Sequence, residues 1–255
     1  MNNFILAAAL STLSLASMAE SETSVSKDIE LGMIATSGNT ESTTLKGKFS
    51  ALHDLKKTKN LFVIEGFYKE DGIQYEADGE TISEDQVTAE KYFISDQFDF
   101  KIDSEHRGVF IFGSYEQDKF SGLDYQSTLA AGYTDRFFST EKSYLDISLG
   151  PGIAFSKAED TDEMDGETEQ SAILRISFNF LYKLSENAKI TQTFASDASP
   201  DSGTNSKTKA ETAITASMTA NMALKASFTI DQNTHPETGK RHADTQTAVT
   251  LVYSI

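Results

Sequence analysis

The feature that most constrains this chain is a two-residue alternation of apolar and polar side chains that recurs along most of its length. Between Ala172 and Tyr182, for example, every second residue is apolar, whereas Arg175, Ser177 and Asn179 fall on the opposite face. Such alternation indicates β-strands with one apolar and one polar face. It marks about twelve segments, near residues 28–36, 42–55, 60–69, 87–100, 107–117, 123–137, 143–156, 169–183, 188–197, 207–219, 222–231 and 242–254.

The length of these segments favours a membrane barrel over a soluble sheet. Several have 11 to 15 residues, whereas strands of soluble proteins typically have roughly 5–6. A tilted strand needs roughly 9–11 residues to cross a bilayer. The pattern therefore predicts strands long enough to span a membrane.

The connections alternate between short and long, as they do in outer-membrane barrels, which have short periplasmic turns and longer external loops. The first external connection, Ser37–Thr40, is an exception, because Gly38-Asn39 suits a tight hairpin turn. The predicted short turns are 56–59, 102–106, 139–142, 184–187 and 220–221, and the predicted longer loops are 70–86, 118–122, 157–168, 197–206 and 232–241.

The last segment resembles the closing strand of a barrel. Val249, Leu251, Tyr253 and Ile255 place apolar side chains at every second position up to the final residue. A terminal strand that faces lipid and seals against the first strand needs this pattern. The alternative is an ordinary edge strand, which rarely ends on bulky apolar residues.

The first 19 residues are predicted to be a signal peptide. Phe4–Leu15 is a short apolar stretch, and Ser17-Met18-Ala19 fits the small-x-small cleavage rule. The alternative is a short buried helix, since the amino-terminal region contains no Lys or Arg. We therefore expect residues 1–19 to be removed on export and residues 20–255 to form one domain.

Composition excludes several functions. The chain has 22 Lys plus Arg against 39 Asp plus Glu, a net charge of -17, which repels nucleic acid. It contains no Cys, so disulfides, thiolate catalysis and cysteine zinc sites are all excluded.

Several short motifs resemble those of a bacterial family, the salt-induced outer-membrane proteins, catalogued as a domain of unknown function. The motifs are Glu30-Leu31-Gly32, Ala35–Glu41 (ATSGNTE), Asp118–Gly122 (DKFSG) with Ala131-Gly132-Tyr133, Leu149–Gly152 (LGPG), and Thr245–Val252 (TQTAVTLV). The final Ile255 departs from the phenylalanine that is usual in the family. The resemblance implies an outer-membrane β-barrel and a link to salt stress, and it transfers no catalytic residues.

Two predicted external loops are strongly acidic. Residues 70–86 and 158–169 each carry seven Asp or Glu and no Lys or Arg. Carboxylates are the ligands that Ca²⁺ and Mg²⁺ prefer, so divalent cations could bridge these loops to lipopolysaccharide. The alternative is a solvated acidic surface, which the composition favours, and residues 160–166 do not fit the spacing of an EF-hand.

No constellation of residues predicts an enzyme. His53, His106, His235 and His242 are scattered, and no Ser or Thr is marked as a nucleophile. His235 and His242, with Asp231, Glu237 and Asp244 nearby, are the one group that suggests a transition metal, but exposed histidines in polar loops are usually unliganded. We therefore predict no catalytic residues, no cofactor and no metal ligands.

The polar faces of the strands are the more informative candidates, because they would line the lumen. They carry Lys46, Lys48, Lys91, Asp99, Asp146, Arg175, Asn179, Lys183, Lys225 and Asp231. Mixed charges of this kind can line a narrow aqueous path or pair with one another into a plug, and the sequence does not choose between them.

Together these patterns predict an all-β, antiparallel transmembrane barrel in the outer membrane. The expected function is that of a non-enzymatic small channel or structural envelope protein. The expected partners are outer-membrane lipids, lipopolysaccharide and, through the C-terminal strand, the barrel-assembly machinery. The alternatives are a membrane-embedded lipid hydrolase and a soluble periplasmic β-sandwich binding protein.

Overall fold

The computed structural model describes residues 24–36, 42–77, 80–102, 107–159, 166–201, 204–236 and 241–255. These residues form twelve strands: β1 (Ser24–Thr36), β2 (Ser42–Asp54), β3 (Thr58–Ala77), β4 (Glu80–Lys101), β5 (Gly108–Asp118), β6 (Leu123–Ser139), β7 (Ser143–Ala158), β8 (Thr168–Lys183), β9 (Ala188–Ala198), β10 (Lys207–Ser217), β11 (Met222–Asn233) and β12 (Ala243–Ser254). In the described part of the chain, no helix is both long enough and apolar enough to cross a membrane.

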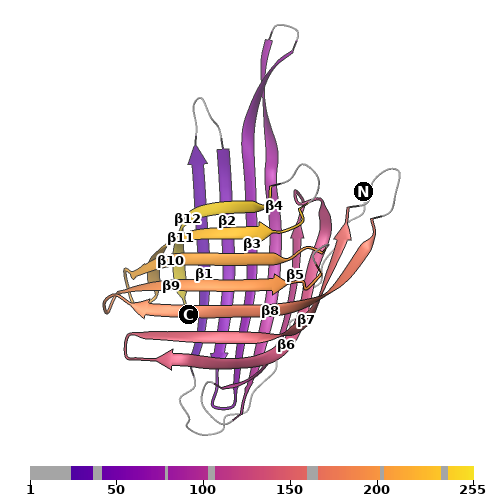
Figure 1. Ribbon diagram of the computed structural model, residues 1–255. Helices are drawn as coiled ribbons and strands as arrows, with labels where there is room; N and C mark the ends of the chain where they lie inside the picture. Colours follow the sequence, from indigo (N-terminus) through magenta and orange to yellow (C-terminus); the bar gives the residue numbers. More distant parts are fainter. Residues whose placement is uncertain are drawn as a thin grey trace, which may run out of the picture.

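The strands close into one antiparallel barrel (Figure 1). Each strand pairs with its neighbours in the sequence, and β1 closes the barrel against β12. Closure pairs the two edges of the sheet with each other along part of their length, which hides backbone polar groups that hydrocarbon would leave unsatisfied. The predicted twelve-strand antiparallel barrel is confirmed, and closure excludes the β-sandwich alternative.

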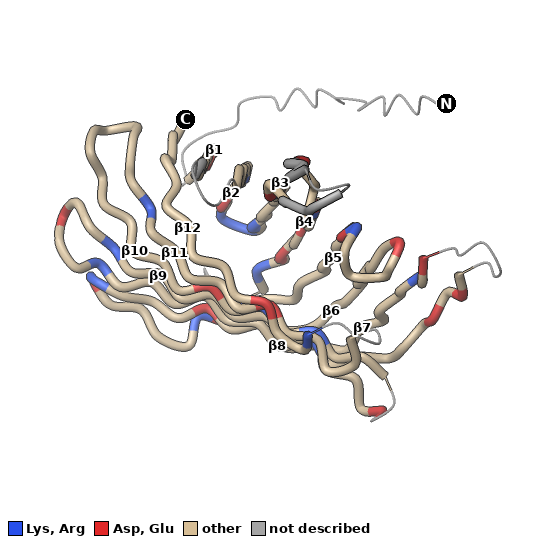
Figure 2. Tube along the Cα trace, turned by 90° about the horizontal axis from the view of Figure 1, so that it is seen from above, with Lys and Arg blue, Asp and Glu red and all other residues tan. Residues whose placement is uncertain are grey.

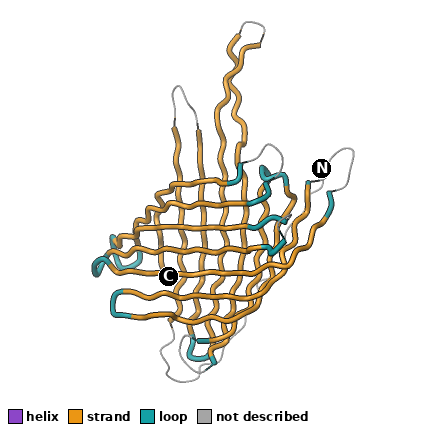
Figure 3. The backbone as a smooth tube through the Cα atoms, in the orientation of Figure 1, coloured by secondary structure: helices purple, strands orange, loops and turns teal. Residues whose placement is uncertain are grey.

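The barrel is flattened, so that its two walls face each other closely. In Figures 1 and 3, the strands β1–β5 run behind and across the strands β6–β12. Side chains of the two walls meet inside: the Arg175 guanidinium of β8 lies 3.4 Å from the centre of the Phe112 ring on β5. Phe110, Phe112 and Ala130 form a buried apolar cluster, in which Phe110 is only 1% exposed. The lumen is therefore partly filled by side chains.

The outer surface is apolar along the middle of the strands. Leu129, Leu149, Leu174 and Val249 are between 43% and 58% exposed although they are aliphatic. Several large exposed aromatic side chains lie toward the strand ends, among them Phe100, Tyr115, Phe137 and Tyr253. This arrangement is typical of the lipid-facing band and aromatic girdles of a membrane barrel.

One predicted loop is wrong. Residues 70–86 were expected to form a long acidic loop, but β3 continues to Ala77 and β4 starts at Glu80. The two strands stay paired from Glu70↔Val87 to Ala77↔Glu80 after a register shift at Lys69/Glu70, and they project beyond the rest of the barrel (Figure 1). The acidic residues concealed the strand-forming residue types Ile73, Tyr75 and Ile82, which alternate with them.

Other predictions lie outside the described residues. These are the signal peptide over residues 1–19, the tight turn over residues 37–40 and the position of His106.

Strands β6 and β7 approach each other closely at a pair of glycines. A Cβ atom on Gly132 would lie 2.2 Å from the carbonyl oxygen of Leu149, and one on Gly150 would lie 2.2 Å from that of Ala131. No side chain fits at these distances, so the Leu149–Gly152 motif has a structural role: it lets the two backbones meet.

We expect Gly150→Ala to lower the free energy of unfolding by about 1–3 kcal/mol, because the added methyl group forces β6 and β7 apart. Urea unfolding of the folded barrel in detergent, followed by the mobility difference between unboiled and boiled protein, measures this change. Gly66→Ala is the matched control, since a Cβ atom there meets nothing within 4 Å. Equal midpoints for both variants would contradict the steric role.

Candidate functional site

The lumen carries charged side chains of both signs and is the candidate functional site. Glu30, Glu116, Arg175 and Lys225 are among its buried residues. Seen from above, both signs of charge occur along the barrel wall (Figure 2). Because an unpaired buried charge is costly, these groups are expected to neutralise one another.

Two lysines join the two walls in the half of the lumen nearer the longer connections, here called the external half. Lys91 on β4 lies 2.9 Å from Asp231 on β11 and 3.2 Å from Glu116 on β5. Lys209 on β10 lies 3.0 Å from Glu65 on β3. The pairs Lys91–Asp231 and Lys209–Glu65 cross the lumen and therefore narrow it, whereas Lys91–Glu116 joins the adjacent strands β4 and β5.

A third lysine contributes to the same group of ion pairs in the external half of the lumen. Lys207 on β10 forms an ion pair with Glu116 and donates a hydrogen bond of 3.2 Å to Gln126 on β6. Glu116 thus receives lysines from both walls. We call Glu65, Lys91, Glu116, Lys207, Lys209 and Asp231 the cross-lumen cluster.

Arg175 occupies the lumen next to the apolar cluster. Its guanidinium donates a hydrogen bond of 2.6 Å to Asp197 on β9 and covers the Phe112 ring. Asp197 also accepts a hydrogen bond of 3.1 Å from Thr128 on β6. Arginine suits this place, since its planar group can pair with a carboxylate and stack on an aromatic ring together.

The opposite half of the lumen, nearer the short turns and here called the periplasmic half after the predicted orientation, has its own pairs. Asp146 on β7 accepts hydrogen bonds from Lys59 on β3 (3.1 Å) and from Arg136 on β6 (2.9 Å). Lys101 on β4 lies 2.6 Å from Asp54 on β2. Ion pairs therefore link opposite or non-adjacent strands at both ends of the lumen.

Lys225 links three strands beside the closure of the barrel. Its ammonium on β11 lies 3.0 Å from Glu30 on β1 and 3.0 Å from Glu211 on β10. All three side chains are nearly buried, with 10–12% exposure. The interaction holds β1 to the end of the sheet independently of the backbone ladder.

The predicted lumenal residues do not all come together. Lys91 meets Asp231, Asp146 meets cations from other strands, and Arg175 and Lys225 are paired as described. Lys46 donates a hydrogen bond of 3.1 Å to Gln246, and Asp99 is buried and accepts one of 2.9 Å from Gln97. Lys183 is exposed at the periplasmic end of β8.

For most of these ion pairs, only one of the two partners was predicted from the sequence. The partners that were missed are Glu30, Lys59, Glu65, Glu116, Asp197, Lys207, Lys209 and Glu211. Each belongs to the polar face of its strand, so strand parity could have identified it. Which residues meet across the lumen depends on the flattening of the barrel, which alternation does not reveal.

Above the cross-lumen cluster, the barrel opens into a cavity of about 1260 Å³ on the external side. The carboxylates of Asp118, Glu159, Glu167, Glu169 and Asp244 line it, together with the guanidinium of Arg241. This external vestibule is therefore acidic.

Carboxylates at the external rim stay ionised at neutral pH. A hydrogen bond of 2.6 Å from Lys119 holds the pKa of Glu90 below its ordinary value. Hydrogen bonds from Lys69 and then Thr88 do the same for the pKa of Asp71. A carboxylate with a lowered pKa stabilises the fold above its ordinary pKa, and this contribution is lost as the pH falls through the folded-state pKa.

The suggested histidine site does not assemble. The Nδ1 atom of His235 lies 3.1 Å from the Thr234 hydroxyl, that of His242 lies 3.3 Å from the Asn233 carbonyl oxygen, and Asp231 is paired with Lys91. Within the described ranges, no three His, Asp or Glu residues are placed to hold a metal ion. Glu237 lies outside those ranges.

We expect Lys225→Met to lower the free energy of unfolding by about 3 kcal/mol, because it leaves two buried carboxylates without their cation. Urea unfolding of the barrel in detergent measures this change in the free energy of unfolding. Lys189→Met, which removes an exposed lysine of β9, is the control and should have little effect. A Lys225→Met midpoint equal to that of the control would show that the three-strand link contributes nothing.

Comparison with known proteins identifies a sequence relative and structures of similar fold. The chain is 24% identical over 176 residues to the uncharacterized protein YdiY of Escherichia coli K12, an alignment that covers 69% of this chain and 66%, just under two thirds, of that protein. The NanC porin superposes with a TM-score of 0.50 at 9% identity, covering 89% of this chain and 98% of the porin. An outer membrane channel from Pseudomonas putida F1 gives a TM-score of 0.47 at 11% identity, over 93% and 96% of the two chains.

At these identities, the porin shows the fold alone. The family comparison goes further, since one family model matches residues 29–255, which is most of the chain. Its description carries no reference to salt, so the family resemblance is confirmed without its salt-induced label. The chain belongs to the family described as protein of unknown function, DUF481.

Proposed function

We propose that this protein is an outer-membrane barrel that conducts small cations through a narrow, ion-paired lumen. The observation that carries the proposal is the cross-lumen cluster lying beneath an acidic vestibule.

The outer surface supports the location. Its exposed aliphatic band and aromatic strand ends suit a bilayer and would be unfavourable in water. The porin with the same fold adds support. In this orientation the short turns lie in the periplasm, and an amino-terminal signal peptide over residues 1–19 would direct export.

The charge distribution favours cations. Asp118, Glu159, Glu167 and Glu169 of the vestibule would raise the local concentration of cations. Below them, Asp231, Glu116 and Glu65 offer successive carboxylates that a passing cation can approach. Each is already held by lysine, so occupancy would be weak and passage narrow.

The same pairs suggest how salt would act. Ion pairs that line water are weakened as ionic strength rises, because the Debye length falls from about 10 Å at 0.1 M to about 3 Å at 1 M. High salt would loosen the cross-lumen cluster, so conductance would rise more steeply than the salt concentration.

The second candidate is a structural envelope barrel with a closed lumen. The observation that favours it is the buried cluster of Phe110, Phe112 and Ala130 beside Arg175. A lipid hydrolase has no support of this kind from the described residues.

Single-channel recording in a planar bilayer tests the proposal. We expect small discrete steps that favour cations, and a larger step for Lys207→Ala combined with Glu116→Ala, because two side chains of the cluster are removed. Glu167→Gln combined with Glu169→Gln should lower conductance by about twofold at 0.01 M salt and have little effect at 1 M, where screening removes the field of the vestibule. External Mg²⁺ should lower the monovalent current if divalent cations bind the acidic rim.

Lys189→Ala is the control, since this exposed lysine lies at the periplasmic end of β9. A bilayer that stays silent for the wild type and for the widened double variant, with folding shown by resistance of the unboiled protein to SDS, would contradict conduction and support the structural role.

The expected partners become proposals of the same kind. Outer-membrane lipids and lipopolysaccharide would surround the apolar band, and β12 would present its outward Val249, Leu251, Tyr253 and Ile255 to the assembly machinery. We expect Tyr253→Ala combined with Ile255→Ala to lower the fraction of protein that reaches the outer membrane in its heat-modifiable form. An unchanged fraction would show that these side chains do not direct assembly.

A further inference from the structure

The closure between β1 and β12 is short and lies at one end of the strands. Only four residue pairs join them in the described ladder, from Asp28↔Ser254 to Leu31↔Leu251. Every other neighbouring pair of strands shares ten or more. A backbone hydrogen bond of 2.9 Å from Ile255 to Lys27 extends the closure only toward the periplasmic end.

The strands separate above Gly32. At this residue they are still close, since a Cβ atom would lie 2.8 Å from Cγ2 of Thr250 and 3.2 Å from the carbonyl oxygen of Val249. If the ladder continued, Ile34 would pair with Ala248, but β1 has no partner on that side in the described structure. An unpaired edge in hydrocarbon leaves backbone polar groups unsatisfied unless water or a ligand reaches them.

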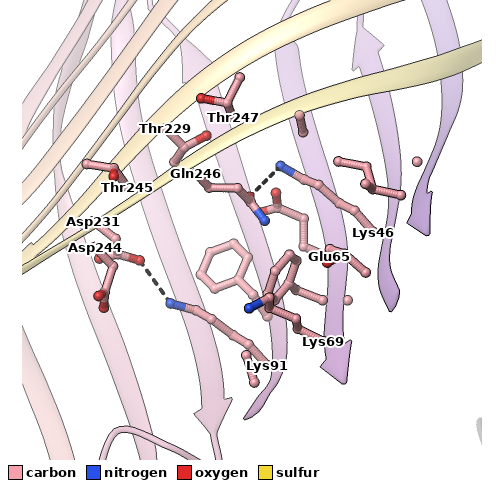
Figure 4. Close-up of a pocket in the computed structure, with 18 of the residues that line it drawn as sticks. Lys46, Glu65, Lys69, Lys91, Thr229, Asp231, Asp244, Thr245, Gln246 and Thr247 are labelled. Carbon is pink, nitrogen blue, oxygen red and sulfur yellow. Dashed lines mark hydrogen bonds and ion pairs between the residues drawn. The ribbon is translucent and has the colours of Figure 1, made fainter. Parts of the chain in front are cut away.

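A cavity of about 530 Å³ fills the gap (Figure 4). It contacts Gly32, Met33 and Ile34 of β1 and residues 244–249 of β12, and it continues inward to Lys46 and Phe67. It therefore connects the separated seam with the lumen.

The outer edge of this opening is apolar. Met33 is 67% exposed and Val249 is 53% exposed on the outer face, whereas Ile34, which shares the inner face of β1 with Glu30, is 49% exposed beside the gap. Leu31 and Leu45 continue the apolar surface on the neighbouring part of the outer wall. Acyl chains lying in the bilayer could therefore contact the edge without meeting a charge.

The inner end of the opening holds an ammonium group that forms no ion pair with any carboxylate in the described part of the chain. Lys69, Lys91 and Lys209 also line the cavity, and each forms an ion pair. Lys46 instead extends from β2 to Gln246 on β12, where its ammonium donates a hydrogen bond of 3.1 Å to a neutral side-chain amide (Figure 4). An ammonium has three donors, so Lys46 can hold Gln246 and an anion together.

We propose that the split seam above Gly32 is a lateral binding site for a membrane phospholipid, whose phosphate is bound by Lys46 while its acyl chains remain in the bilayer. The apolar edge and the ammonium of Lys46, which forms no ion pair among the described residues, match the two ends of such a lipid. Asp244 lies two residues from Gln246 on the same face of β12, about 7 Å away, and can receive the ammonium of a zwitterionic headgroup. The proposal rests on the membrane location given above but not on ion conduction.

Native mass spectrometry of the full barrel in detergent with added phosphatidylethanolamine, whose headgroup carries both a phosphate and an ammonium, tests the site. We expect the wild type to retain lipid, and Lys46→Gln to retain about tenfold less, since one charge-assisted hydrogen bond is lost. Lys189→Gln, which removes the same charge at the periplasmic end, should retain lipid like the wild type. Equal retention by Lys46→Gln, or displacement of the lipid by inorganic phosphate at a similar concentration, would overturn the proposal.

Disulfide formation in lipid vesicles tests the opening itself, in a chain without any cysteine of its own. Ile29→Cys with Tyr253→Cys, which face each other in the closed part, should cross-link on oxidation. Ile34→Cys with Ala248→Cys should not, because the seam is open there. Complete cross-linking of the second pair without loss of bound lipid would overturn the lateral route. If the planar bilayer showed no current, ion conduction would be contradicted, but the expected lipid retention and cross-linking would not change.

Discussion

The constraint on which the structure depends is the need to pair every backbone N–H and C=O group away from water. A sheet in hydrocarbon can meet it only by closing on itself. Closure places one face of every strand toward the outside and the other toward the lumen. The apolar band and the charged interior both follow from that single requirement.

Charges that face inward must then find partners. In this barrel they do so across the lumen as well as along the wall: Lys91 reaches Asp231 and Lys209 reaches Glu65. Such bonds require the walls to lie close together, and the flattening of the barrel provides this. Much of the acidic excess of the chain instead lies at the external vestibule and rim, where water solvates it. The flattened shape and the distribution of charge therefore both keep unpaired charges out of the buried lumen.

Much of the fold could be predicted from alternation alone, because a period of two reports directly on strands that have two different environments. The exception at residues 70–86 arose because the seven carboxylates of this ribbon resembled those of an acidic loop and outnumbered its few strand-forming residues. The site was less accessible. Lys46, Arg175 and Lys225 could be assigned to the lumen by parity, but their partners depend on shear, flattening and the approach of β6 to β7 at Gly150. The short closure at Gly32 was equally hidden, since Val249 and Leu251 alternate as regularly above the split as below it.

The paired extension of β3 and β4 gives the barrel a marker of its own orientation. Because its two strands satisfy each other, it needs no bilayer to keep its shape, and Ala77 stands eight residues beyond Lys69, a rise of about 26 Å at roughly 3.3 Å per residue. In the proposed orientation this ribbon is the first part of the molecule that an antibody or a phage tail would meet. It is also a natural place to graft a peptide for display on the cell surface, since a change at its end lies far from both the lumen and the seam.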